Sequence, residues 1–114
     1  MKTVHHFYFD DARDMRTLAG ESVQLVVTSP PYPMIRMWDD LFSRLNPAVG
    51  RAIDSGDGWR AFELMHAELE PVWREVYRIL TPGGIACINT GDAVRTVGGE
   101  FRLYPNHARL LAVL

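Results

Sequence analysis

Apolar runs along the chain predict three β-strands. Residues 23–28 read Val-Gln-Leu-Val-Val-Thr, a run rich in β-branched residues that is typical of a buried strand. An aromatic-rich run over residues 4–9 and an apolar run over residues 85–89 predict the other two strands. The stretches between these runs are long enough to hold helices.

Apolar positions three and four residues apart predict one long helix from Asp57 or Gly58 to Leu80. Its buried stripe consists of Phe62, Met65, Leu69, Val72, Val76 and Ile79. Pro71 lies inside this pattern, so we expect a kink or a break into two helices there. The stretch Thr81-Pro82-Gly83-Gly84 then ends the helix.

Shorter elements fill the rest of the chain. Helices are predicted over residues 11–19, 38–45 and 106–114. Glycines and prolines predict a mobile surface loop over residues 46–58 and a second loop over residues 90–99. Two strands joined through a long helix imply a right-handed crossover, because parallel neighbours need such a connection. The predicted fold class is therefore α/β, in one small domain with a parallel sheet.

The end of the strand at residues 23–28 carries the most informative motif, Ser29-Pro30-Pro31-Tyr32, which we call the hook. Two prolines prevent the chain from continuing as strand or helix, since each fixes φ and neither offers an N–H group. Ser29 precedes a proline and is therefore held extended. The pattern predicts a rigid turn at the carboxyl end of a strand, where open α/β sheets bind their ligands.

The hook suits a flat heterocycle that carries an exocyclic amino group. An amino group donates hydrogen bonds, and the Ser29 hydroxyl and Pro30 carbonyl are two acceptors for it. Tyr32 offers a stacking surface, a contact worth roughly 1–3 kcal/mol per base. These interactions are the ones that hold a nucleobase flipped out of a duplex. The alternative is a proline-rich turn that only closes a core strand.

A strand that ends in Ser29-Pro30-Pro31-Tyr32 resembles the catalytic motif of the DNA amino-methyltransferases. These enzymes methylate N4 of cytosine or N6 of adenine with S-adenosylmethionine, and the serine form is more typical of the cytosine enzymes. The resemblance implies a partial Rossmann-like methyltransferase fold, with a mainly parallel sheet flanked by helices. It also implies Ser29 and Pro30 as acceptors, Pro31 as a stiffener and Tyr32 as the stacking platform.

Two further segments extend the resemblance over nearly the whole chain. Residues 7–12 resemble the family's short strand that ends in Gly-Asp, which makes Asp11 a candidate cofactor-binding residue. From the residues alone, the favoured role of Asp11 is the cap of the helix predicted after it, and with the resemblance the cap and the cofactor role stand about even. Residues 78–85 resemble the family's helix end and Pro-Gly-Gly turn.

The family's cofactor fingerprint, a strand followed by a Phe-x-Gly-x-Gly loop, is absent. In a circularly permuted subgroup the hook comes first, and the target-recognition region and the fingerprint follow it. A hook at residue 29 fits that order. We therefore expect residues 1–114 to be the amino-terminal, catalytic-motif part of a methyltransferase domain, inactive without a complementary chain or its own carboxyl-terminal half.

The charge balance indicates that much of the contact with double-stranded DNA lies outside this chain. Twelve basic residues, all arginine except Lys2, stand against 14 acidic residues, for a net charge of −2. Phosphate contacts need a basic face, and this composition does not supply one.

The cysteine, histidine and apolar content of the chain excludes several other classes of protein and site. Cys87 is the single cysteine, which rules out an internal disulfide and fits a reducing cytoplasm. Its mid-strand position predicts a small buried core residue. No apolar run is long enough to span a membrane, and no two of the four histidines have metal-ligand spacing. We expect the histidines to be solvated or to cap helices.

The predicted function is transfer of a methyl group from S-adenosylmethionine to N4 of cytosine in DNA, in a restriction-modification setting. An N6-adenine DNA methyltransferase is the nearest alternative. Methylation of an amino group on RNA or on a protein glutamine is disfavoured, because relatives with those substrates usually carry Asn where this chain has Ser29. A non-catalytic remnant or a split subunit is the third possibility.

Overall fold

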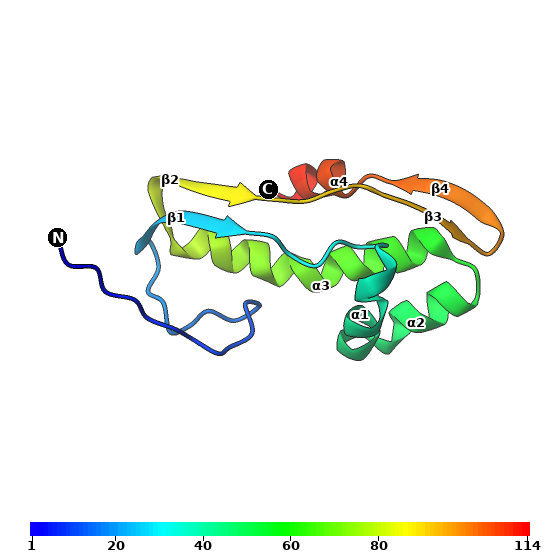
Figure 1. The fold of residues 1–114 in the computed structure, drawn as a ribbon, viewed down its shortest axis with the longest axis horizontal. Helices are drawn as coiled ribbons and strands as arrows, with labels where there is room; N and C mark the ends of the chain where they lie inside the picture. Colours follow the sequence, from blue (N-terminus) through cyan, green and yellow to red (C-terminus); the bar gives the residue numbers. More distant parts are fainter.

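The fold is organised around one long helix, α3 (Gly58–Ile79), in a computed structural model that describes all residues from 1 to 114. The other elements are β1 (Val23–Thr28), η1 (Arg36–Trp38), α1 (Asp39–Leu45), α2 (Pro47–Asp54), β2 (Leu80–Ile88), β3 (Ala93–Val97), β4 (Glu100–Tyr104) and α4 (Asn106–Val113). Strands β1 and β2 lie along the carboxyl-terminal half of α3, and the β3–β4 hairpin lies along its amino-terminal half (Figure 1). The molecule is elongated, at 56 × 24 × 23 Å.

Strands β1 and β2 are parallel and are joined through α3, as the sequence predicts. Leu25 pairs with Ile85 and Thr28 with Ile88, whereas Val23 pairs with Leu80. The residues between Leu80 and Ile85 therefore bulge out of the register, and they are the Thr-Pro-Gly-Gly turn predicted to end the helix. The α/β class is confirmed, although the parallel sheet has two strands and the remaining two form a separate antiparallel hairpin.

Helix α3 is continuous through Pro71, so of the predicted kink or break the break is wrong, and the kink stays a prediction. A proline inside a helix costs about 3 kcal/mol, because it removes one hydrogen bond and its ring crowds the preceding turn. Packing on both sides of the proline offsets that cost. Met65 and Leu69 before it, and Trp73 and Val76 after it, are all buried in the same core.

The mobile loop predicted over residues 46–58 is instead largely helix α2. Asn46 caps it by accepting a hydrogen bond from the Ala48 N–H at 3.0 Å, and Pro47 occupies the first helical turn, where its missing N–H is harmless. Gly50 allows α2 to approach α1, because a Cβ there would lie 3.1 Å from Ser43 Oγ. The glycine thus reflects close helix packing.

The loop predicted over residues 90–99 contains strand β3 and the turn of the β3–β4 hairpin. Gly98 and Gly99 form that turn with φ of 59° and 79°, values that glycine adopts without steric cost. The inner face of the hairpin buries Ala93, Val97 and Tyr104 against the core. Two neighbouring glycines here mark a tight hairpin.

The amino-terminal segment differs from both elements predicted for it. Residues 4–9 form no strand, because no neighbouring strand pairs with them, and residues 11–19 form turns instead of a helix. Arg78 of α3 donates hydrogen bonds to the carbonyls of Met15 and Leu18 at 2.9 Å each. Glu75 accepts one from the Met15 N–H at 2.6 Å. The side chains of Arg78 and Glu75 thus form hydrogen bonds with backbone groups that would pair with each other in a helix.

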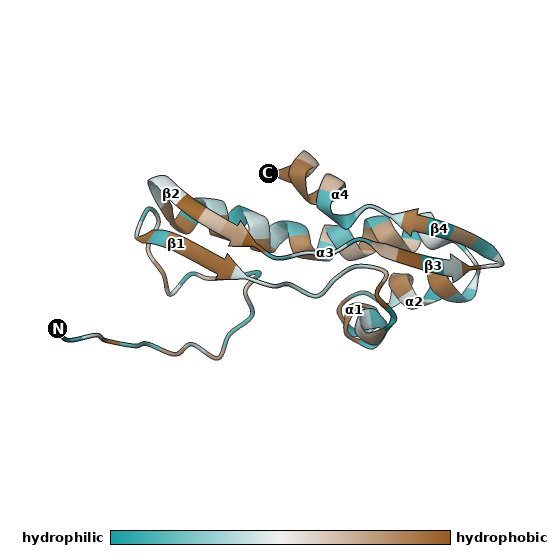
Figure 2. Ribbon diagram, turned by 45° about the horizontal axis from the view of Figure 1, so that its top comes forward, coloured by the Kyte–Doolittle hydropathy of each residue, from teal (hydrophilic) through white to brown (hydrophobic).

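The two faces of the β1–β2 pair have different environments. Val26 and Ile88 pack against the core formed with α3, whereas Leu25, Val27 and Ile85 are 55–73% exposed on the outer face. Both strands are strongly hydrophobic (Figure 2). Cys87 pairs with Val27 on this outer face and is exposed, so its prediction as a core residue is wrong. None of the helices combines the length and the hydrophobicity that a membrane span requires.

Candidate active site at the end of strand β1

The hook leaves the carboxyl end of β1 beside the segment that leaves β2. The Asn89 N–H donates a hydrogen bond to the Thr28 carbonyl at 2.9 Å, which carries the parallel register one residue past β2. Ser29 is exposed, and Pro30, Pro31 and Tyr32 are half-buried. The hook and residues 89–92 therefore border the same end of the parallel pair, the end at which α/β sheets bind ligands.

The structure brings the two hydroxyl groups of the hook together. Ser29 Oγ and the Tyr32 phenolic oxygen are hydrogen-bonded at 3.1 Å, and either can be the donor. The Tyr32 ring lies beside Gly91, where a Cβ would be 3.6 Å from Tyr32 Cε2. The Pro30 carbonyl accepts no hydrogen bond from the chain. The hook thus offers two hydroxyls bonded to each other, one carbonyl with no partner in the chain, and one aromatic ring.

The back of the hook rests on the helices. Only about 10 Å³ of cavity remains between Pro30, Pro31 and Pro33 on one side and Leu69, Trp73 and Leu110 on the other. That space is close to the smallest that holds one water molecule. The hook is therefore supported from behind, while its hydroxyl stays at the surface.

Met34, two residues after Tyr32, holds the backbone in an unusual conformation. It is 1% exposed, and its φ of 67° lies in the left-handed region. For a residue other than glycine this conformation costs about 1–2 kcal/mol. The Met34 N–H donates to Met65 Sδ at 3.2 Å, and Arg95, paired with Asp39 at 2.7 Å, approaches the Met34 carbonyl. Asp39 raises the pKa of Arg95, which keeps the guanidinium charged in this half-buried setting.

Sequence reasoning missed a buried amide contact behind the hook. Asn106 is 1% exposed, and its Nδ2 donates to the carbonyls of Pro33 at 2.8 Å and Gly91 at 2.9 Å. Its Oδ1 lies 2.9 Å from Nε2 of His66. His66 is 5% exposed, so the expectation that it is solvated or a cap is wrong. Its position four residues after Phe62 and three before Leu69 would have placed it on the buried stripe.

Burial lowers the pKa of His66, because the desolvated ring disfavours its charged form. The ring also packs edge-on against Phe62, with centroids 4.6 Å apart. His66 therefore contributes a neutral imidazole to the contact with Asn106.

Asp92 lies at the end of the segment that borders the hook. Its hydrogen bonds connect that segment to α4. Its carboxylate accepts hydrogen bonds from the His107 N–H at 3.1 Å and from His107 Nδ1 at 2.8 Å. These bonds to His107 lower the pKa of Asp92. The Asp92 carboxylate thus caps the start of α4, where negative charge is favourable.

Asp11, the candidate cofactor residue, is paired with a neighbour. Its carboxylate accepts from the Arg13 N–H at 2.9 Å and contacts the Arg13 guanidinium at 2.7 Å. These bonds lower the pKa of Asp11. Because residues 11–19 form no helix, its alternative role as a helix cap is wrong. The cofactor role stays a prediction.

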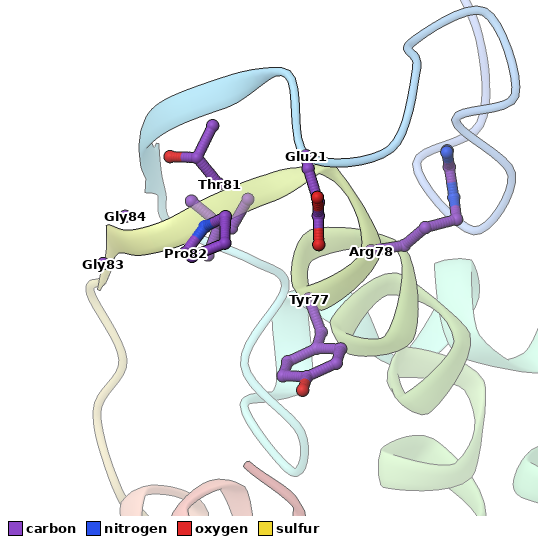
Figure 3. Close-up of a pocket in the computed structure, with 8 residues that line it drawn as sticks. Glu21, Tyr77, Arg78, Thr81, Pro82, Gly83 and Gly84 are labelled. Atoms are coloured by element: carbon purple, nitrogen blue, oxygen red, sulfur yellow. The ribbon is translucent and has the colours of Figure 1, made fainter.

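A hollow of about 540 Å³ lies at the other end of β2 (Figure 3). It is lined by Glu21, Tyr77, Arg78, Leu80, Thr81, Pro82, Gly83 and Gly84. This is the amino end of the strand, opposite to the end that binds ligands in parallel sheets. The Arg78 guanidinium is also engaged already with Glu75 and with backbone carbonyls. The hook, and not this larger hollow, is therefore the candidate active site.

A parallel β-α-β unit with Ser-Pro-Pro-Tyr at the carboxyl end of its first strand has the arrangement of a nucleobase amino-methyltransferase. Residues 23–104 match the N6/N4 methyltransferase family model, whose description is DNA methylase. The chain therefore belongs to this family of DNA methylases.

Relatives and a solved structure agree with this assignment. The chain is 54% identical over 112 residues to the type II methyltransferase M.MthZI of Methanothermobacter thermautotrophicus, covering 97% of this chain and 32% of that protein. It is 49% identical over 120 residues to M.MjaI of Methanocaldococcus jannaschii, covering 96% and 40%. The crystal structure of TTHA0409, a DNA modification methylase of Thermus thermophilus, superposes with a TM-score of 0.68 at 32% identity, covering 96% of this chain and 39% of that one. The chain thus spans a third to two fifths of the length of these proteins.

Proposed function

We propose that this chain is the catalytic-motif part of an enzyme that methylates N4 of cytosine in DNA. The observation that carries the proposal is the exposed Ser29 hydroxyl at the carboxyl end of β1, beside the Tyr32 ring and the unbonded Pro30 carbonyl. A rigid set of acceptors next to an aromatic ring suits a base whose reacting group is an amino nitrogen.

The proposed role of the hook is to hold that amino group in a reactive geometry. The lone pair of an exocyclic amino nitrogen is delocalised into the ring, which makes it a poor nucleophile. Acceptors at Ser29 and Pro30 favour a tetrahedral nitrogen and stabilise the positive charge that develops on it. Pro31 keeps the two acceptors fixed, and Tyr32 stacks on the ring, so that positioning lowers the barrier further.

The hydrogen bond between the two hydroxyls suggests how Ser29 is oriented. If the Ser29 hydroxyl donates its hydrogen to the Tyr32 oxygen, both lone pairs of Ser29 Oγ stay available to the amino group. Tyr32 then has two roles, one through its ring face and one through its hydroxyl. The choice of cytosine over adenine rests on the serine of the motif, which is more typical of the cytosine enzymes.

S-adenosylmethionine supplies the methyl group in this reaction when it is bound. No strand of this chain leads through a glycine-rich loop into a helix: β1 leads to the hook, β2 to residues 89–92, and the Gly98-Gly99 turn joins two hairpin strands. These residues do not fit the methionine end of that molecule, and Asp11 is the single position proposed to face it. We propose that another part of the enzyme holds the methyl donor.

That other part can be a complementary chain or a continuation of this one, and it also supplies the target-recognition region. The exposed apolar face formed by Leu25, Val27 and Ile85 supports this proposal, as does the greater length of the relatives. It would also carry most of the contact with double-stranded DNA, because this chain has a net charge of −2. With DNA as the substrate, we expect the enzyme to act in the cytoplasm.

A chimera tests the proposal. This chain replaces the aligned segment of the Methanothermobacter relative, and the product is incubated with DNA and labelled S-adenosylmethionine. Nucleosides from the digested DNA are then identified by mass spectrometry. We expect N4-methylcytosine, and we expect Ser29→Ala to lower kcat by about 10²-fold with little change in DNA affinity. Ser22→Ala, an exposed serine at the amino end of β1, is the matched control.

Three results would change this conclusion. N6-methyladenine without N4-methylcytosine would assign the enzyme to adenine. An inactive chimera beside an active parent would favour a non-catalytic remnant. A fully active Ser29→Ala variant would refute the acceptor role of that hydroxyl.

A further inference from the structure

The side chain of Asn106 joins three parts of the molecule at one buried point. Its amide nitrogen bonds the Pro33 carbonyl, directly after the hook, and the Gly91 carbonyl, in the segment beside the Tyr32 ring. Its amide oxygen bonds His66 of α3. The group has two N–H donors and one carbonyl, and each of them has a partner, as a buried amide requires.

The chemistry of the partners fixes the orientation of this contact. Two backbone carbonyls can only accept hydrogen bonds, so the amide NH₂ must face them. The amide oxygen then faces His66, whose Nε2 must carry a hydrogen to donate. Since the buried ring is neutral, its Nδ1 is unprotonated, and a single tautomer is selected.

Both carbonyls that Asn106 binds belong to segments leaving the carboxyl ends of the parallel strands. Pro33 continues the end of β1, and Gly91 continues the end of β2. One planar amide therefore links the backbone directly after Tyr32 to the segment that lies beside the Tyr32 ring. It also anchors the backbone directly before Met34, which is held in a left-handed conformation.

We propose that Asn106, oriented by His66, is a positioning residue for the hook. It fixes the Pro33 and Gly91 carbonyls relative to each other, and so holds Ser29 and Tyr32 in the arrangement that receives the base. Asn106 does not touch the base. The proposal rests on the proposed function only in taking the hook as the base-binding surface.

Three variants test the contact. Asn106→Asp keeps the shape of the side chain but sets a carboxylate against two carbonyl oxygens and removes both donors. His66→Leu removes the donor to Asn106 and leaves the amide intact, and His66→Gln restores an N–H near the position of Nε2. Glu63→Gln is the control, because it removes the ion pair of Glu63 with Arg109 between the same two helices and leaves the amide in place.

The first measurements use the 114-residue chain itself. Nitrogen-15 NMR should show His66 protonated at Nε2 alone, and the side-chain amide protons of Asn106 protected from exchange. Loss of a buried hydrogen bond speeds local opening roughly 5- to 100-fold. We therefore expect the Met34 and Ile35 amides to exchange that much faster in Asn106→Asp and His66→Leu, and nearly normally in His66→Gln and Glu63→Gln.

Any one of three results would overturn the proposal. The first is an Nδ1–H tautomer of His66, and the second is free exchange of the Asn106 side-chain amide protons. The third is unchanged exchange at Met34 and Ile35 in both disruptive variants. If Asn106→Asp does not fold, the two His66 variants decide the question by their difference.

The methylating chimera links the contact to turnover. There we expect Asn106→Asp to lower kcat by about 10²-fold, the scale of a 1 Å misplacement, with KM for DNA nearly unchanged. His66→Gln should keep most of the activity that His66→Leu loses. A raised KM with normal kcat would overturn the positioning role. If the unsubstituted chimera does not methylate DNA, the proposed function fails, while NMR and hydrogen exchange in the chain still decide whether Asn106 holds the hook.

Discussion

Replacing Gly58 with alanine is expected to destabilise the protein, although alanine is the better helix former. Gly58 is the first residue of α3, and a Cβ there would lie 1.9 Å from the Tyr104 hydroxyl oxygen and 3.0 Å from Tyr104 Cζ. Tyr104 is 1% exposed, and its ring packs against Trp59 and Phe62, with centroids 5.3 and 5.7 Å away. The ring therefore has little room to move aside.

Two opposing effects set the size of the change. Alanine in place of glycine stabilises a helix by up to about 1 kcal/mol. Overpacking a rigid core typically costs about 1–3 kcal/mol. We expect the free energy of unfolding to fall by about 1–2 kcal/mol, which lowers Tm by about 4 °C per kcal/mol for a domain of this size. Tyr104→Phe removes the oxygen at 1.9 Å, so the double variant should regain most of the loss.

Urea unfolding, followed by tryptophan fluorescence and circular dichroism, measures all four members of this double-mutant cycle. Gly20→Ala is the matched control, because a Cβ at Gly20 has no neighbour closer than 3.5 Å. A Gly58→Ala variant as stable as the parent would refute the predicted clash. So would a double variant whose stability equals the sum of two independent effects.

Two further predictions concern the hook and the segment beside it. Tyr32→Phe removes the hydrogen bond to Ser29 but keeps the ring, so in the chimera it should lower kcat by less than about tenfold, whereas Tyr32→Ala should also weaken binding of the flipped base by roughly 1–3 kcal/mol. A Tyr32→Phe variant as impaired as Tyr32→Ala would show that the hydroxyl carries the whole effect. His107 lowers the pKa of Asp92 in the folded protein. The Asp92 carboxylate therefore stabilises the fold at pH values above its unfolded pKa of about 3.9. This stabilisation is lost as the pH falls from that unfolded pKa to the lower folded pKa. Acid unfolding curves of Asp92→Asn should therefore be flatter below about pH 4 than those of the parent, and identical slopes would contradict the assignment.

The sequence predicts well those elements whose signals are local. The apolar run at residues 23–28 and the three-four spacing of α3 each specify their element alone, and the crossover rule then supplies the parallel pairing. The hook could be predicted as well, because two prolines restrict the backbone whatever surrounds them. Helix α2 also has a local signal, Asn46 before Pro47, but the glycines nearby favour a loop when only the sequence is considered.

Other features depend on contacts between distant residues. Residues 4–9 have the composition of a strand but no partner strand, and composition cannot reveal that. The side chains of β2 alternate between the two faces of the sheet, so the sequence places Cys87 on one face. Which of the two faces α3 covers is decided by packing, and Cys87 lies on the exposed one. His66 and Asn106 are separated by 40 residues in the chain, so their contact behind the hook follows only from the folded structure.

The exposed aliphatic face of the β1–β2 pair bears on how long a copy of the chain survives in a cell. Exposed apolar surfaces favour association, and chaperones and proteases act on chains that display them, so we expect the chain to be longer-lived when a partner covers this face. We expect the abundance of such a chain to follow the supply of the partner that covers this face more closely than its own rate of synthesis. Such coupling would limit the number of orphan copies without a dedicated regulator.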